Sequence, residues 1–211
     1  MKNKILEPKI KRSRLIEDTF NNVKNDKIEC RYFRNQNIDY KLNSIEWNEC
    51  IFENIDFLSM GFNDCDFIDC IFINCNLSNM NINQKSLIRC QFVECKMIGF
   101  QIFSCSIFNV SFNKCSLDYC NLTTSHFKNI MFEECTFDNA RLFELKLENT
   151  IFCSCSFKNG EIYKTNLKYI DFSTCDIDTV SIDLMSISGV IVTTAQIITL
   201  APLLGIQIKK Y

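Results

Sequence analysis

The sequence predicts a solenoid, a fold in which the chain winds into stacked coils, and three observations support this class. Every fifth residue from Leu42 to Val192 is large and apolar, and no insertion or deletion breaks the register. A period of five fits neither an α-helix, at 3.6 residues, nor a β-strand, at two. The 211 residues include only 5 glycines and 2 prolines, so the turns must be made without the usual breakers.

The length of one coil follows from the spacing of identical residues. Seven phenylalanines recur at intervals of twenty, which is four units of five, so we expect their rings to stack in one column: Phe52, Phe72, Phe92, Phe112, Phe132, Phe152 and Phe172. Six cysteines form a second column on the adjacent face: Cys75, Cys95, Cys115, Cys135, Cys155 and Cys175. Coils that pair as β-strands lie about 4.8 Å apart, so about seven and a half coils give a rod of about 36 Å.

The cysteines suggest zinc, disulfide or thiol chemistry at first sight, as in CDFIDCIFINCNL, residues 65–77. Thirteen of the fourteen, however, fall two residues before a repeat position, and Cys153 is the exception. A straight column offers neither the tetrahedral geometry of zinc nor the Cβ separation of a disulfide. We therefore expect reduced, metal-free cysteines that fill the core. Cys153 is expected to point outward from its unit. It is then either a reactive thiol or a cysteine that the surface tolerates.

Lys85 and Phe100 are unusual for their position. They stand two residues before a repeat position, where many other units have a small residue such as cysteine that we expect to point inward. A buried lysine without a partner is costly, so Lys85 should reach outward to solvent or mark a local distortion.

The ends of the chain depart from the repeat. Residues 1–18 are predicted to be a basic N-terminal arm, and residues 19–41 an N-terminal cap with an irregular first coil, before the repeats of residues 42–192. The N-terminus lacks the apolar run of a secretory signal, which favours a cytoplasmic protein with reduced thiols. The uncharged stretch from Leu184 to Ile208 is long enough to span a membrane. The five-residue register at Ile187 and the many Ser, Thr and Gln residues favour a folded cap instead.

Residues 193–211 are predicted to form that cap, a short helix followed by a strand. Thr193 and Gln196 have the spacing of a capping box, Pro202 limits the helix, and Gly205 suits its C-terminal end. The open end of a β-helix exposes unpaired strand edges, which must be covered. We expect a two-fold homodimer to cover them through these side chains: Ile197, Leu200, Ala201, Leu204, Ile206 and Ile208.

Charge is distributed unevenly. Residues 43–188 carry 19 acidic and 10 basic side chains, whereas residues 1–42 carry 6 acidic and 11 basic ones. An acidic rod repels nucleic acid and favours the basic protein surfaces that bind it. The candidate partner-binding acids form an N-terminal and a C-terminal group: Glu46, Glu49, Glu53, Asp56, Asp64, Asp66 and Asp69, then Asp171, Asp176, Asp178 and Asp183.

Enzymatic chemistry and cofactors find little support. The single histidine, His126, takes an outward slot without a nucleophile placed to use it, and the chain has no phosphate-binding or dinucleotide-binding glycine pattern. Carboxylate pairs such as Asp64 and Asp66, or Glu133 and Glu134, are more typical of a solvated face. The sequence therefore predicts a non-enzymatic protein without catalytic residues, metal or cofactor.

The units CDFID, CIFIN, CNLSN, CSLDY, CNLTT, CTFDN and CSFKN resemble the pentapeptide repeat family, and the resemblance covers residues 42–192. It implies an all-β solenoid, a right-handed quadrilateral β-helix in which four units make one square coil. The central Leu or Phe and the small residue of each unit would both point inward.

The C-terminal residues Gly189, Val192, Gln196, Gly205 and Ile206 resemble the cap of the Qnr-type and mycobacterial fluoroquinolone-resistance pentapeptide proteins. That resemblance implies a dimeric acidic rod that mimics duplex DNA and binds DNA gyrase or topoisomerase IV. The expected outcome is protection against quinolones or natural topoisomerase poisons. The alternative is a β-helical interaction scaffold for another basic partner.

Overall fold

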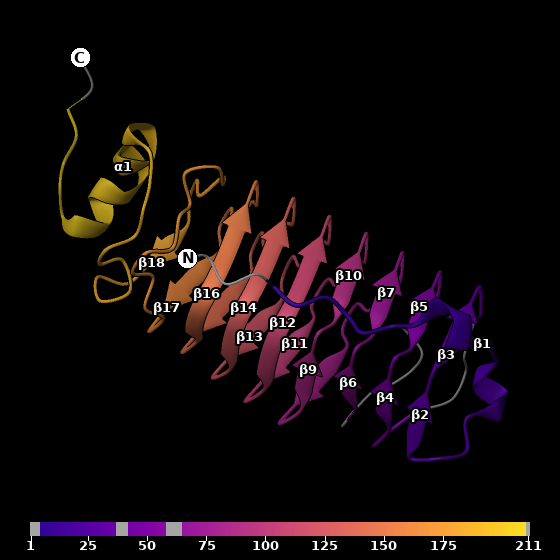
Figure 1. Cartoon of the computed structure of the whole chain (residues 1–211). Helices are drawn as coiled ribbons and strands as arrows, with labels where there is room; N and C mark the ends of the chain where they lie inside the picture. The colour runs from indigo at the N-terminus through magenta and orange to yellow at the C-terminus, as the bar shows by residue number, and fades with distance from the viewer. Residues whose placement is uncertain (1–4, 37–41, 58–64, 210–211) are drawn as a thin grey trace.

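The chain forms a parallel β-solenoid of about seven turns with one short helix at its C-terminal end (Figure 1). The computed structural model describes residues 5–36, 42–57 and 65–209, with every side chain among them except that of Leu204. Phe62 and Asp64, which the repeat pattern includes, lie outside the described residues.

Two parallel sheets and a row of single bridges make the walls of the solenoid. The 12-stranded sheet contains β1 (Ile16–Glu17), β2 (Lys27–Glu29), β3 (Arg31–Arg34), β4 (Glu46–Asn48), β5 (Ile51–Glu53), β6 (Asp66–Ile68), β7 (Ile71–Ile73), β9 (Ser86–Ile88), β10 (Gln91–Val93), β12 (Ser106–Asn113), β14 (His126–Glu133) and β16 (Lys146–Cys153). The 6-stranded sheet contains β8 (Asn81–Asn83), β11 (Gln101–Phe103), β13 (Asn121–Thr123), β15 (Arg141–Phe143), β17 (Glu161–Tyr163) and β18 (Ser181–Ile182). Isolated bridges from Asp56 to Asp176 connect the coils on a further face.

Strand register confirms a coil of twenty residues. Phe72 pairs with Phe92 and Leu122 with Leu142, always in parallel. The first coils differ, because Phe33 pairs with Phe52 and Ile28 with Trp47, at a spacing of nineteen. Short 3-10 helices at Arg12–Arg14 and Phe20–Asn22 flank β1.

The coils turn through residues in the left-handed backbone region, which explains how a glycine-poor chain makes so many corners. Asn109, Asn129 and Asn149 have φ of 56°, 56° and 48°, and Lys114 and Glu134 adopt the same region on the next corner. Asparagine tolerates this region better than most residues do. Elsewhere the local cost, about 1 kcal/mol for each residue, is offset by hydrogen bonds to the neighbouring coils.

The core consists of stacked inward side chains. The rings of Phe72 and Phe92 lie 4.7 Å apart and 4° from parallel, and the rings of Phe92 and Phe112 lie 4.8 Å apart. The stack continues through Phe132 and Phe152 to Phe172, whose ring is tilted by 35°. This regular stacking follows from the register, because identical residues face one another in successive coils.

The cysteines occur as free thiols, twelve of them buried, and Cys30 and Cys153 half-buried. In the cysteine column each Sγ donates to a carbonyl oxygen 23 residues earlier, as from Cys115 to Phe92 at 3.5 Å. Burial raises the pKa of Cys105 and Cys120, which disfavours their thiolates. Across the described residues, no three His, Cys, Asp or Glu side chains gather as a metal site.

The two unusual inward residues leave the coil register intact. Lys85 is half-buried, and its Nζ lies 3.5 Å from Asp66 Oδ2, so its charge reaches the outer surface. Phe100 is fully buried. Leu87 still pairs with Ile107 and Ile82 with Ile102, so the coils accommodate both residues without an insertion.

The C-terminal cap begins with helix α1 (Thr194–Leu200), and the predicted capping box between Thr193 and Gln196 is present. Gln196 also binds the helix to the last coil, because its Nε2 donates to the carbonyl oxygens of Phe172 and Cys175, both at 2.8 Å. A 3-10 turn, Ala201–Leu204, follows and ends at Gly205, whose φ is 72°.

The predicted strand at Ile206 and Ile208 does not form in the single chain. A strand needs a neighbour to accept and donate its hydrogen bonds, and no other strand of the described chain pairs with these residues. No helix in the described part of the chain has the length and apolar character needed to cross a bilayer.

Candidate protein-interaction surface

Outward side chains form columns along the solenoid, because residues twenty apart occupy equivalent positions in successive coils. Opposite charges in one column therefore pair across coils. Arg141 Nε lies 3.0 Å from Glu161 Oε2, and Lys164 Nζ lies 3.0 Å from Glu144 Oε1. Such exposed pairs contribute little stability, but they cancel charge on the surface.

The N-terminal group of candidate acids is largely engaged within the chain. Glu46 lies 3.3 Å from Lys27, Asp66 lies 3.5 Å from Lys85, and Asp69 forms a bidentate pair with Arg89 at 2.6 Å. The other described members accept hydrogen bonds: Glu49 from Cys30, Glu53 from the Tyr32 hydroxyl and Asp56 from Asn76. Lys and Arg side chains therefore compensate the charges of Glu46, Asp66 and Asp69, whereas the thiol and hydroxyl donors of Glu49 and Glu53 leave those charges in place. Asp64 is outside the described residues.

Two of the C-terminal candidates also serve the fold. Burial raises the pKa of Asp183, but hydrogen bonds from Ser186, Lys164 and Met185 outweigh it and hold the pKa below its usual value. The backbone N–H of Asp178, and then Lys158 at 3.0 Å, lower the pKa of Asp176. Both carboxylates therefore stay ionised at neutral pH while they organise turns.

The other two C-terminal candidates, Asp171 and Asp178, have exposed side chains. Asp171 Oδ1 accepts from the backbone N–H of Ser173 at 2.8 Å.

Asp118, Asp138 and Asp178 share a single column on the face formed by the isolated bridges, and we call them the acidic column. Asp118 Oδ1 accepts from Asp138 N at 3.0 Å, and Asp138 Oδ1 accepts from Lys158 N at 3.0 Å. Lys158 occupies the position between Asp138 and Asp178, but its Nζ pairs with Asp176. No side-chain nitrogen of a Lys or Arg in the described chain lies within 4.0 Å of the three carboxylates.

Asp118 and Asp138 were missed among the candidate acids. Their spacing of twenty was a signal in the sequence that could have found them.

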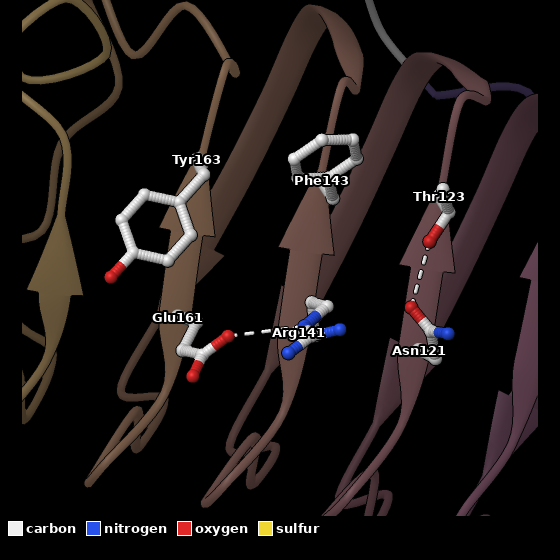
Figure 2. A pocket seen from close by; sticks show the side chains of 6 residues that line it. All are labelled: Asn121, Thr123, Arg141, Phe143, Glu161 and Tyr163. Atoms are coloured by element: carbon white, nitrogen blue, oxygen red, sulfur yellow. Dashed lines mark hydrogen bonds and ion pairs between the residues drawn. The ribbon is translucent and has the colours of Figure 1, made fainter.

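A shallow groove of about 440 Å³ crosses β13, β15 and β17 on the 6-stranded sheet (Figure 2). It is lined by Asn121, Thr123, Arg141, Phe143, Glu161 and Tyr163. Arg141 and Glu161 pair with each other, and Lys164 Nζ lies 4.9 Å from the centre of the Phe143 ring. These lining groups include no nucleophile beside a base, which acid–base or nucleophilic catalysis would require.

His126 is engaged in a charged cluster. Its Nε2 lies 3.3 Å from Glu148 Oε1, and its ring meets Phe108 edge-on at 5.2 Å. A hydrogen bond from Lys146, followed by contributions from Lys128 and His126, lowers the pKa of Glu148 to about 2. This arrangement explains the histidine as part of a surface ion-pair network.

The C-terminal cap exposes four isoleucine side chains, Ile197, Ile198, Ile206 and Ile208, which we call the apolar end. Ile197 is 55% exposed, while Leu200 and Ala201, from the predicted dimer interface, are buried within their own chain. Their burial follows from the way Gln196 fixes α1 against the last coil, which turns that side of the helix inward. Of the predicted interface residues, Leu200 and Ala201 therefore face inward, and Ile197, Ile206 and Ile208 are exposed. The side chain of Leu204 lies outside the described part of the chain.

A solenoid with square coils of twenty residues, a sealed side-chain core and long columns of outward side chains belongs to the repeat-protein class. Residues 40–122 and 65–142 match the family model described as pentapeptide repeat region. The chain therefore contains a pentapeptide repeat region.

Comparison with solved structures gives low-identity likenesses. A trypsin-treated variant of QnrB1, a plasmid-mediated fluoroquinolone resistance protein, is 19% identical with a TM-score of 0.43, covering 92% of this chain and 96% of that one. Full-length QnrB1 is 19% identical with a TM-score of 0.35, covering 85% and 90%.

HetL of the cyanobacterium Nostoc, a pentapeptide repeat protein involved in heterocyst differentiation regulation, is 10% identical with a TM-score of 0.30, covering 78% and 84%. The comparison with curated proteins finds no match. Likenesses at these TM-scores carry no argument about activity.

Proposed function

We propose that this protein is a non-enzymatic, cytoplasmic binder of a type II topoisomerase, DNA gyrase or topoisomerase IV. Its acidic surface takes the place of duplex DNA and protects the enzyme from quinolones or natural poisons. The observation that carries the proposal is the acidic column, three carboxylates in register without a cationic partner within 4.0 Å among the described residues.

Spacing and charge sign support this partner class. Asp118 and Asp138 belong to adjacent coils, about 4.8 Å apart, and Asp178 lies two coils further along. Phosphates along one DNA strand repeat at about 3.4 Å, so a basic DNA-binding surface meets negative charges at a comparable density. Such binding weakens steeply with salt, because exposed charges are screened over about 8–10 Å at physiological ionic strength.

The acidic column gives the first prediction. The variant with Asp118→Asn, Asp138→Asn and Asp178→Asn should bind purified gyrase at least about tenfold more weakly and lose protection against ciprofloxacin in a supercoiling assay. Asparagine keeps the acceptor oxygens, so the turns should survive. The control is Glu46→Gln with Glu161→Gln, whose carboxylates are already paired with Lys27 and Arg141. Wild-type binding by both variants would reject DNA mimicry.

Homodimerisation through the apolar end is the second part of the proposal. Ile197, Ile198, Ile206 and Ile208 are exposed apolar side chains of the cap, and a two-fold contact would bury them and extend the rod to about 75–100 Å. Ile197→Asp should give a monomer in sedimentation experiments, because it places a charge in that contact. Tyr119→Asp, at an exposed left-handed corner far from the cap, is the control. A wild-type protein that sediments as a monomer at micromolar concentration contradicts the dimer.

The second candidate function is a scaffold for another basic partner. Cross-coil ion pairs favour it, because they leave the rod with a mixed rather than a uniformly negative surface. Failure of wild-type protein to bind or protect gyrase and topoisomerase IV would leave this scaffold function in place of the first.

A further inference from the structure

The N-terminal arm lies back along the solenoid instead of extending from its end. Figure 1 shows the indigo start of the chain crossing the strands of the 12-stranded sheet. Lys9 N donates to Asp69 Oδ1 at 2.9 Å, and Leu6 N donates to Asn109 Oδ1 at 3.4 Å, two coils further along. In chain order the arm therefore runs from the central coils toward the N-terminal end of the solenoid, where the 3-10 turn at Arg12–Arg14 leads into β1.

The spacing of these two hydrogen bonds matches the solenoid. Three residues of extended chain span about 10 Å, and two coils rise about 9.6 Å. Pro8 fixes an extended φ and has no N–H, and it also favours extended backbone at Glu7. The arm is consequently preorganised to present its N–H groups at the period of the corner beneath it.

The corner beneath the arm is less exposed to solvent than the next corner of the solenoid. On the next corner Asn74, Glu94, Lys114 and Glu134 are all exposed, whereas under the arm Asp69 is only 5% exposed. Arg89, Asn109 and Asn129 of that corner are half-buried. A buried carboxylate requires compensation, which Asp69 receives from Arg89 and from the arm's N–H.

The corner also carries a ladder of side-chain amides. Asn149 Nδ2 donates to Asn129 Oδ1 at 2.9 Å, and Asn129 Nδ2 donates to Asn109 Oδ1 at 3.1 Å. Asn109 Oδ1 thus ends the ladder and accepts the arm's N–H as well. This ladder fixes the acceptor in place before any peptide binds, which lowers the entropic cost of recognition.

Recognition of the arm depends on its backbone more than on its charged side chains. Lys9, Lys11, Arg12 and Arg14 are all exposed, while Pro8 and Ile10, on either side of Lys9, are half-buried. The two hydrogen bonds that anchor the arm use main-chain N–H groups. A site of this kind accepts other extended peptides that have aliphatic or proline residues at the facing positions.

We propose that Asp69, Arg89, Asn109 and Asn129 form a peptide-binding track, occupied in cis by the N-terminal arm and open to an extended, basic segment of a partner protein. A basic segment matches the composition of the arm itself, and residues 43–188 as a whole, with 19 acidic against 10 basic side chains, attract such a segment at long range. The arm acts as a tethered competitor at an effective concentration in the millimolar range, so a partner must displace it. This site is separate from the acidic column and does not depend on topoisomerase binding.

The direct test uses a fluorescent synthetic peptide of residues 1–11 and a variant that lacks those residues. Fluorescence anisotropy should show the peptide binding the truncated protein at least about tenfold more tightly than the full chain, where the arm occupies the track. In the truncated protein Asn109→Gly should weaken binding severalfold, because glycine keeps the left-handed backbone but removes the acceptor. Asn139→Gly, at an exposed corner with φ of 58°, is the matched control and should have no effect. Equal binding to both proteins, or equal binding of a scrambled peptide, overturns the proposal.

A second measurement keeps the test decisive if the truncated protein does not fold. In the full chain the Lys9 amide should be protected from hydrogen exchange. Asp69→Gly keeps the left-handed backbone but removes the acceptor, so it should speed that exchange at least about tenfold. Asn139→Gly should leave that exchange unchanged. A Lys9 amide that exchanges at the rate of an unstructured peptide in the folded full chain also overturns the proposal.

Discussion

The first coils and the central coils follow the same five-residue pattern but differ in register and in charge pairing. In the first coils the spacing is nineteen, as between Phe33 and Phe52, whereas Phe112 pairs with Phe132 at twenty. Glu46 and Glu53 of the first coils face Lys27 and the Tyr32 hydroxyl, whereas Asp118 accepts the backbone N–H of Asp138. The inward pattern therefore fixes the fold, but the residue one coil away decides whether an outward charge is available to a partner.

The core gives the largest expected effect. Phe112→Ala should lower the free energy of unfolding by about 3–5 kcal/mol, because its ring stacks on Phe92 at 4.8 Å and on Phe132 at 4.7 Å. Phe172→Ala should cost less, because the Phe172 ring is tilted and 5.6 Å from Phe152. Chemical denaturation of both variants measures the difference. Equal losses would show that stacking in the central coils adds nothing to burial.

Charge pairing gives an intermediate effect. Arg89→Ala should destabilise the protein by about 2–4 kcal/mol, because it leaves the carboxylate of Asp69 buried without its bidentate partner. Arg141→Ala removes an exposed cross-coil pair and should cost about 0–1 kcal/mol. Thermal and urea unfolding compare the two. If Arg141→Ala is the more damaging change, burial does not govern these pairs.

The pH dependence of stability gives the smallest effect. The lowered pKa of Asp183 means that its contribution is present above the carboxyl's usual pKa and is lost as pH falls through the folded value. Stability should therefore drop as pH falls from about 5 toward 2, and Asp183→Asn should reduce part of that drop. Urea midpoints across this range measure it. Asp178→Asn, at an exposed carboxylate, serves as the control, and an equal change in both variants contradicts the role of the Asp183 turn.

Features that repeat along the chain were predictable from the sequence. The way the terminal segments pack against the solenoid was not. The coil length follows from Phe52 and Phe72, because identical positions must face one another once the chain closes a coil of twenty. The capping box at Thr193 was also readable, since it depends on residues three apart. The side of α1 that faces inward was not, because it depends on where Gln196 finds its two carbonyl acceptors.

The path of the N-terminal arm was equally hidden. Its contacts join main-chain N–H groups to Asp69 and Asn109, and such groups leave no signature in a sequence. The acidic column was only partly predictable, because the alignment of Asp118 with Asp138 is visible only when the sequence is written in rows of twenty residues.

The left-handed corners have a consequence for how such a rod can change in length. Because Lys, Glu, Thr and Tyr all occupy these corners, almost any side chain is accepted there, and the outer surface is free to vary while the inward pattern is constant. An inserted segment preserves every column only if it contains twenty residues or a multiple of twenty. Duplication of one coil would therefore lengthen the molecule in steps of about 4.8 Å while each face kept its alignment, so growth and surface chemistry can evolve separately.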